Sequence, residues 1–174
     1  MKRFTIKEGK HPACPFIFNF MRRPGCLSWE VRFTESCRYD HGDQDQQDWN
    51  KLCGIAFLGW FKHPSHWNSA MIGWRYSPNF EAWEVNAYYH LNNSRSFTAP
   101  LMVIPVMQSL EIDLMIDYRR KDYRFVLISG DQIAEHRQGF RHRARFAREI
   151  NTWFGGNKPA PHKVHLLKQT LLRC

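Results

Sequence analysis

The sequence predicts an all-β protein, an antiparallel two-sheet β-sandwich of the jelly-roll type with one short C-terminal helix. Three observations support this fold class. About ten short segments have strand-like patterning, turn-forming residues separate them at intervals of roughly 8–12 residues, and only one segment has helical spacing. The chain has 174 residues, of which 43% are hydrophobic and 15% aromatic, enough apolar material for a folded core. We expect residues 1–174 to form a single domain.

The first half of the chain contains two predicted strands separated by a polar loop. Residues 27–36 (LSWEVRFTES) alternate between apolar and polar side chains, the pattern of a half-buried strand. Residues 51–61 (KLCGIAFLGWF) form an apolar run typical of a buried strand. Between them, residues 41–50 (HGDQDQQDWN) are polar and rich in turn formers, which indicates a loop.

A β-hairpin is predicted next, with strands at residues 69–76 and 80–90 joined by Ser77-Pro78-Asn79. Short strands at residues 95–97 and from Leu101 onward are expected to follow it. Side chains alternate between the two faces of a strand. The second hairpin strand therefore places Trp83, Val85, Ala87 and Tyr89 on a core face, and Glu84, Asn86, Tyr88 and His90 on the opposite face.

The last third of the chain begins with an antiparallel meander, whose predicted strands are residues 109–118, 123–129 and 132–138. Residues 141–154 (RHRARFAREINTWF) are predicted to be the one helix, because their apolar side chains have helical spacing with arginines between them. The final segment, VHLLKQTLL, is ambiguous by pattern, and we expect it to be a closing strand.

Two sets of segments resemble known sandwich proteins. Residues 109–136 (SLEIDLMIDYRRKDYRFVLISGDQIAEH) resemble the Tyr-x-Phe strand and flanking turns of concanavalin A-like domains. The segments DWNKLCGI, NSAMIGWRY and FGGNKPAPH, between Asp48 and His162, are similar to a group of small bacterial β-sandwich proteins with no assigned activity. These resemblances imply a jelly-roll or concanavalin A-like sandwich, and they imply no activity because fold alone does not fix function.

The chain has no pattern of a membrane or secreted protein. Its longest apolar runs, residues 15–21 and 100–107, are shorter than the ~20 residues of a membrane span. The N-terminus lacks the continuous apolar stretch of a signal peptide, and the five cysteines include no CxxC, which favours thiols over disulfides or a zinc site. We expect a cytoplasmic protein that does not bind membranes; the sequence gives no indication of its oligomeric state.

A set of aromatic and polar residues near the hairpin is typical of a ligand site on a concave sandwich face. An aromatic ring packs on the C–H side of a sugar, while amides and arginine bond its hydroxyls. We therefore predict a non-enzymatic domain that binds a small polar ligand, either a carbohydrate or a nucleotide-like molecule. The predicted ligand-binding residues are Trp67, Asn68, Arg75, Asn86, Tyr88 and His90.

An alternative partner follows from the charge distribution. Residues 119–174 hold 13 Lys and Arg against 4 Asp and Glu, which accounts for the whole net charge of +9. Such a segment attracts nucleic acid, phosphate or an acidic protein. The residues predicted for this interaction are Arg137, Arg141, Arg143, Arg145 and Arg148.

Metal sites are a weaker alternative. His63 and His66 have a spacing found in metal sites, but a metal requires further ligands that the sequence does not identify. The acidic loop Asp40–Asp48 begins like a calcium loop, but Gln47 and Asp48 occupy positions where an EF-hand needs other residues. No metal and no cofactor is therefore predicted.

A glycan-active hydrolase is the second alternative function, with Glu111, Asp113 and Asp117 as the candidate carboxylates. The same acids are expected on the solvated face of an ordinary amphipathic strand. The sequence contains no G-x-S-x-G, P-loop or H-E-x-x-H motif. The question of enzymatic activity stays open, and the balance favours a protein that is not an enzyme.

Overall fold

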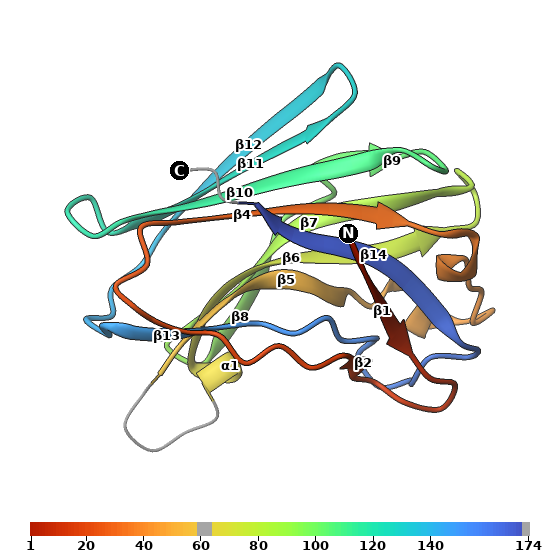
Figure 1. Cartoon of the computed structure of the whole chain (residues 1–174), viewed down its shortest axis with the longest axis horizontal. Helices are drawn as coiled ribbons and strands as arrows, with labels where there is room; N and C mark the ends of the chain where they lie inside the picture. The colour runs from red at the N-terminus through yellow and green to blue at the C-terminus, as the bar shows by residue number, and fades with distance from the viewer. Residues whose placement is uncertain (59–63, 172–174) are drawn as a thin grey trace.

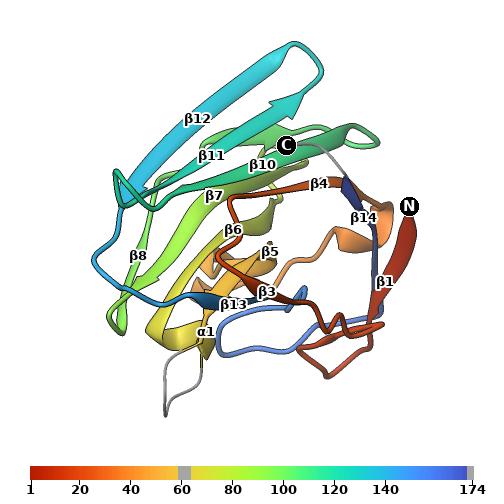
Figure 2. The same cartoon turned by 60° about the vertical axis from the view of Figure 1, so that its left-hand side comes forward.

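The structure, a computed structural model that describes residues 1–58 and 64–171, consists of two antiparallel sheets packed face to face (Figure 1). Sheet A contains β1 (Lys2–Ile6), β2 (Ala13–Cys14), β4 (Cys26–Phe33), β10 (Ser109–Asp117), β11 (Asp122–Ser129), β12 (Gln132–Gly139) and β14 (Val164–Leu171). Their order in space is β12–β11–β10–β4–β14–β1–β2. The β11–β12 hairpin projects at one end of the molecule in both views (Figures 1 and 2).

Sheet B contains β3 (Phe20–Arg22), β5 (Asn50–Phe57), β6 (Asn68–Ser77), β7 (Ala82–Leu91), β8 (Ser94–Phe97), β9 (Met102–Ile104) and β13 (Phe146–Glu149). Its order in space is β3–β13–β5–β6–β7–β8, and β9 pairs with β7. The helical segments of the described chain are short: η1 (Glu35–Cys37), η2 (Gln44–Gln47) and α1 (Pro64–Trp67). None of the helices in residues 1–58 and 64–171 is long and apolar enough to cross a membrane. The predicted fold class, an antiparallel two-sheet sandwich, is confirmed.

The core lies between the two sheets and is rich in aromatic side chains. Trp29 of β4 and Phe125 of β11 enter it from sheet A, and Trp74, Trp83 and Tyr89 enter it from sheet B. In β7 the side chains alternate between this core and the opposite face of sheet B, as the sequence predicts. The predicted meander is also confirmed, since β10, β11 and β12 are neighbours in sheet A.

The predicted helix at residues 141–154 is wrong. This segment contains the short strand β13, which pairs with both β3 and β5. Ala147 and Glu149 of β13 point into the sandwich, while Phe146 and Arg148 point away from it. Because Ala147 is small and Glu149 is charged, the inner face of β13 lacks the large apolar residues at every second position that normally mark a strand. The helical spacing of the apolar residues is then the stronger pattern. The ambiguous C-terminal segment is a strand, β14, which lies between β1 and β4.

Three of the cysteines are thiols, as predicted, and one is not. Cys37 and Cys53 are buried and Cys14 is exposed. Burial raises the pKa of both buried thiols to about 12, so they are protonated and unreactive. Cys26 is disulfide-bonded, contrary to the expectation from the cysteine spacing. The cytoplasmic location therefore stays a prediction.

A buried lysine lies inside the sandwich near its open edge. Lys168 of β14 is 1% exposed, and its Nζ donates to Thr152 Oγ1 at 3.3 Å and to the Leu52 carbonyl at 3.5 Å. Its Nζ also stands 4.7 Å from the centre of the Phe4 ring. Burial lowers the pKa of Lys168 below 10.5, although electrostatic interactions with Cys53 and Glu149 act in the opposite direction. The charged form of this amine is therefore costly in the folded state.

We expect Lys168→Met to raise the free energy of unfolding at pH 7 by about 1–2 kcal/mol, because it removes a desolvated ammonium group. Since the pKa is lower in the folded state, the penalty is complete below the folded pKa and disappears as the pH approaches 10.5. The advantage of the variant should therefore shrink as the pH rises toward 10.5 in urea unfolding experiments. A variant that is less stable than the wild type at pH 7 would show that attraction to Glu149 outweighs desolvation.

Candidate functional site

Two adjoining cavities lie over the outer face of sheet B, the face turned away from sheet A. They share Lys51, His66 and Trp153 in their lining, and their volumes are about 570 and 340 Å³. We call the two together the groove. The other lining residues are Gln47, Asp48, Trp49, Arg75, Tyr88, Arg95, Phe97 and residues 155–157 in the larger cavity, and Phe16, Arg148, Ile150 and Asn151 in the smaller one.

The floor of the groove is formed by strands β5, β6 and β7. The register places Met71 beside Tyr88 and Arg75 beside Glu84, all on the face opposite the core. Because side chains alternate along a strand, the same strands present an apolar face to the core and a face of both polar and apolar residues to the groove. Below the ligand space, Ala56, Met71, Tyr88 and Ile150 form a small apolar cluster against which Trp49 packs.

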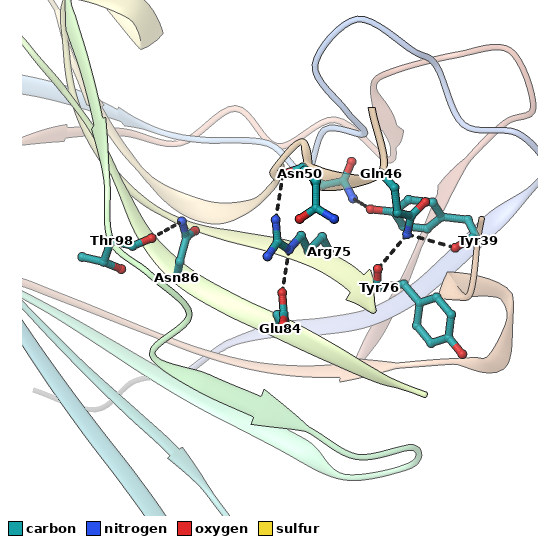
Figure 3. Close-up of polar contacts among 9 residues, drawn as sticks. Tyr39, Gln46, Asn50, Arg75, Tyr76, Glu84, Asn86 and Thr98 are labelled. Atoms are coloured by element: carbon teal, nitrogen blue, oxygen red, sulfur yellow. Dashed lines mark hydrogen bonds and ion pairs between the residues drawn. The ribbon is translucent and has the colours of Figure 1, made fainter. Parts of the chain in front are cut away.

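Gly73 of β6 allows Trp49 to lie close to this floor. A Cβ atom at position 73 would stand 2.4 Å from Asn86 Oδ1 and 3.3 Å from Trp49 Cβ, so no larger residue fits without moving a neighbour. Asn86 itself is fully buried, and its Nδ2 donates to the Thr98 carbonyl at 3.2 Å (Figure 3). The Asn86 amide therefore holds the segment after β8 against β7, beneath the groove.

Arg75 connects the floor to the loop that carries Trp49. Its Nε donates to Glu84 Oε2 at 2.6 Å (Figure 3), and its Nη1 donates to the Gln47 carbonyl at 2.9 Å. Its guanidinium carbon also lies 4.4 Å from the centre of the Trp49 ring. Both members of the ion pair are mostly buried. Arg75 is thus a lining residue of the groove and a structural link at the same time.

Trp153 forms the wall between the two cavities. Its backbone exchanges two hydrogen bonds with Lys51, at 2.8 and 2.9 Å, and it bridges to Pro12 on its other side. Its ring stacks on His11 with centroids 5.4 Å apart and planes 13° apart. The residue is nevertheless 38% exposed. A rigid backbone therefore holds an aromatic face that a ligand can contact.

The groove contains more positive than negative charge. Lys51, Arg95 and Arg148 line it, and none of the three takes part in an ion pair with another described residue. Burial, and secondly the charge of Arg148, lowers the pKa of Lys51. Of the carboxylates nearby, Glu84 is paired with Arg75. A net positive field therefore acts on the ligand space.

His90, a residue in the floor of the groove, is subject to the same positive charges. It is 5% exposed, and its Nδ1 is 3.0 Å from Ser69 Oγ. Burial, followed by the charges of Lys51, His66 and Arg95, lowers the pKa of His90 to about 4. Its imidazole is consequently neutral at physiological pH.

The six predicted ligand residues are separated by the structure into three groups. Arg75 and Tyr88 line the groove, while Asn86 and His90 lie in its floor as buried residues. Asn68 has the strand parity of the core residues, and its Oδ1 accepts a hydrogen bond from the Asn92 backbone. Trp67 is partly buried at the end of α1, and its carbonyl accepts a hydrogen bond from the Asn93 backbone.

The five predicted phosphate-binding arginines also lie in different places. Arg137 is on β12 of sheet A, where Glu135 pairs with it at 2.9 Å. Arg148, by contrast, lines the groove over sheet B. Arg141, Arg143 and Arg145 are exposed in the connection between β12 and β13. Without a helix, no common helical face gathers the five residues.

The structure gives the acidic loop a structural role, and it describes only one histidine of the predicted pair. Lys158 forms ion pairs with Asp43 and Asp45, which fastens the loop to the segment after Trp153. His63 lies outside the described residues. Within residues 1–58 and 64–171, no group of three or more His, Cys, Asp or Glu side chains is arranged to hold a metal ion.

The carboxylates considered for a hydrolase lie on the other sheet from the groove. Glu111, Asp113 and Asp117 belong to β10 of sheet A, and their parity places them on its outer face. Asp117 Oδ1 accepts hydrogen bonds from the backbones of Arg119 and Arg120, which stabilises the turn into β11.

Two further cavities differ from the groove in having no tryptophan among their lining residues. One of about 730 Å³ lies beside the acidic loop, and among its lining residues Arg75 and Glu84 are already paired with each other. The other, of about 680 Å³, lies at the edge next to the buried Lys168 and Glu149. The groove is therefore the best candidate site.

Sequence reasoning missed Trp49, Lys51 and Trp153, because each lies in or next to a segment interpreted as a loop, a buried strand or a helix.

No protein-family model matches the chain, and no curated protein matches it. A functionally unknown protein from Saccharomyces cerevisiae is 9% identical over 98% of this chain and 89% of its own, with a TM-score of 0.52. The SPRY domain of human HERC1 is 11% identical over 99% and 91%, with a TM-score of 0.49. A peanut lectin is 9% identical over 90% and 74%, with a TM-score of 0.42. These similarities concern the β-sandwich fold alone.

Proposed function

We propose that the protein binds a carbohydrate in the groove and does not alter it chemically. The observation that carries this proposal is the partly exposed face of Trp153, held rigidly over a floor with hydrogen-bonding groups. Sugar rings present C–H groups to an aromatic face and hydroxyls to polar side chains. Arg75 has donors beyond those used by Glu84 and Gln47, and Asp48 and Asn157 also line the larger cavity.

The size and rigidity of the groove support the same proposal. A volume of about 570 Å³ falls in the range of ligand pockets, and the walls rest on paired strands. Polar groups that are already positioned lose little conformational entropy when they bind a ligand. The carboxylates of β10 are on the other sheet, so the proposal assigns them no role in the groove.

We expect Trp153→Ala to weaken carbohydrate binding by about tenfold or more, equivalent to ~1.4 kcal/mol, because it removes the stacking face. Binding is measured by calorimetry with oligosaccharides selected from an immobilised panel. Trp153→Phe should retain much of the affinity, since a ring remains.

Ile133→Ala is the matched control, because Ile133 is an exposed apolar residue on β12, in the other sheet. It should bind like the wild type. If no saccharide of the panel binds with a Kd below about 1 mM, or if Trp153→Ala binds as tightly as Ile133→Ala, the proposal is wrong.

A further inference from the structure

The smaller cavity of the groove brings two cations together. Lys51 and Arg148 both line this space of about 340 Å³, together with the apolar side chains of Phe16 and Ile150. Arg148 lies on β13 opposite Ala56 of β5, the strand that also carries Lys51. Burial, and secondly the charge of Arg148, lowers the pKa of Lys51. Two side chains of like charge therefore line the same small cavity.

No carboxylate of the described chain neutralises this pair. Neither Lys51 nor Arg148 takes part in an ion pair within residues 1–58 and 64–171. Arg148 Nε is buried and has no hydrogen-bond acceptor among the described residues. Two half-buried cations without a counter-ion repel each other, and the apolar walls strengthen that repulsion by lowering the local dielectric constant. An anionic group placed between them would relieve the repulsion and supply the missing acceptor.

We infer, on the basis of the carbohydrate-binding function proposed above, that the preferred ligand is an acidic carbohydrate whose carboxylate or sulfate group pairs with Lys51 and Arg148. The sugar ring that carries this group would lie beside Trp153, which lines both cavities. A neighbouring sugar would occupy the larger cavity, where Arg75 and Asp48 line the space.

The shape of the charge distribution favours an acidic sugar over a nucleic acid strand. A strand presents phosphates at regular intervals and is bound by a row of cations along a channel. Here the two neighbouring cations converge on one small cavity, which suits a single anionic group. The exposed arginines at positions 141, 143 and 145 lie before β13, and none of them lines the groove.

The test compares four probes of similar length: a neutral glucose oligosaccharide, an oligogalacturonate, a sulfated oligosaccharide and a single-stranded oligonucleotide. We expect the wild type to bind at least one acidic oligosaccharide about tenfold or more tightly than the neutral one at low salt. The preference should decrease as salt screens the charges. The two acidic probes distinguish a carboxylate from a sulfate.

Lys51→Met and Arg148→Met should each move the ratio of acidic to neutral affinity toward one. Arg119→Met is the matched control, because it removes one positive charge at an exposed turn of sheet A. That variant should keep the wild-type ratio. Thermal unfolding of all three variants checks that each is folded.

The possible results separate the two proposals. Equal affinity for neutral and acidic oligosaccharides overturns this inference and leaves the carbohydrate-binding function intact. Binding of no oligosaccharide overturns both. Tightest binding of the oligonucleotide, lost in Lys51→Met and Arg148→Met, overturns the inference in favour of a nucleic acid ligand.

A second measurement follows the floor of the groove directly. Burial, and secondly the charge of Lys51, lowers the pKa of His90 to about 4, and this pKa should rise when an acidic oligosaccharide is bound, since the anion offsets the charge of Lys51. NMR titration of the imidazole with and without the acidic probe measures the change. An unchanged pKa of His90 in the presence of a saturating acidic ligand contradicts the placement of the anion beside Lys51.

Discussion

Glu149→Ala is expected to lower the free energy of unfolding by about 3–5 kcal/mol, the largest loss among the variants considered. Glu149 is 2% exposed and points into the sandwich from β13. Its Oε1 accepts from Trp29 Nε1 at 2.8 Å, and its Oε2 accepts from Asn19 Nδ2 at 3.4 Å. Alanine would leave the Trp29 donor buried without an acceptor and would remove the carboxylate that favours the charged form of Lys168.

Glu149→Gln is the control for this prediction. Glutamine can still accept a hydrogen bond from Trp29 Nε1 while it removes the charge, so we expect a smaller loss of about 1–2 kcal/mol. Urea unfolding followed by tryptophan fluorescence measures both variants. A loss below about 1 kcal/mol in Glu149→Ala would mean that water or a rearranged side chain replaces the carboxylate.

Arg75→Ala should destabilise the protein by about 2–4 kcal/mol in addition to any effect on ligand binding. Glu84 is 7% exposed, and alanine would leave it as a buried carboxylate without its partner. The same change removes the hydrogen bond to the Gln47 carbonyl and the guanidinium group that lies over the Trp49 ring. The sequence indicated only a ligand contact at Arg75, whereas the ion pair with Glu84 predicts effects on ligand binding and on stability together.

The double variant Arg75→Met with Glu84→Gln separates the two contributions. Because it removes both charges, it should be more stable than Arg75→Ala, and the coupling energy follows from a double-mutant cycle. Chemical denaturation gives stability, and oligosaccharide calorimetry gives affinity. If Arg75→Ala unfolds at the same urea concentration as the wild type, the ion pair with Glu84 contributes nothing to stability.

The strands could be predicted from the sequence wherever one face is apolar and the other polar. In β7 the core residues and the outward residues alternate without interruption, and the assignment of Trp83 and Tyr89 to the core was correct. The pattern does not reveal that both faces are buried. Glu84 and Asn86 are covered through tertiary contacts, such as the ion pair of Glu84 with Arg75 and the hydrogen bond of Asn86 to the Thr98 carbonyl.

The candidate site was predicted only in part, for a related reason. Arg75 and Tyr88 lie on regular strands, where parity identifies the outward face. Trp153 follows β13, in a segment whose inward carboxylate Glu149 and inward Ala147 remove the strand pattern. Lys51 is the second residue of the buried strand β5, and its side chain faces outward. These residues meet at one groove through contacts between segments that are distant in the sequence. The periodicity within a segment gives no information about such contacts.

The bridges around Trp153 also have a consequence for the order of folding. Thr152 donates to the Leu52 carbonyl across 100 positions of the chain, and its own carbonyl accepts from Ala13. Contacts between such distant segments carry a large loop-closure entropy and slow the folding of β proteins. The hairpin of β6 and β7 is local and can pair earlier. During refolding, binding competence should therefore appear after most of the strand structure, so that ligand affinity reports on completion of the native state.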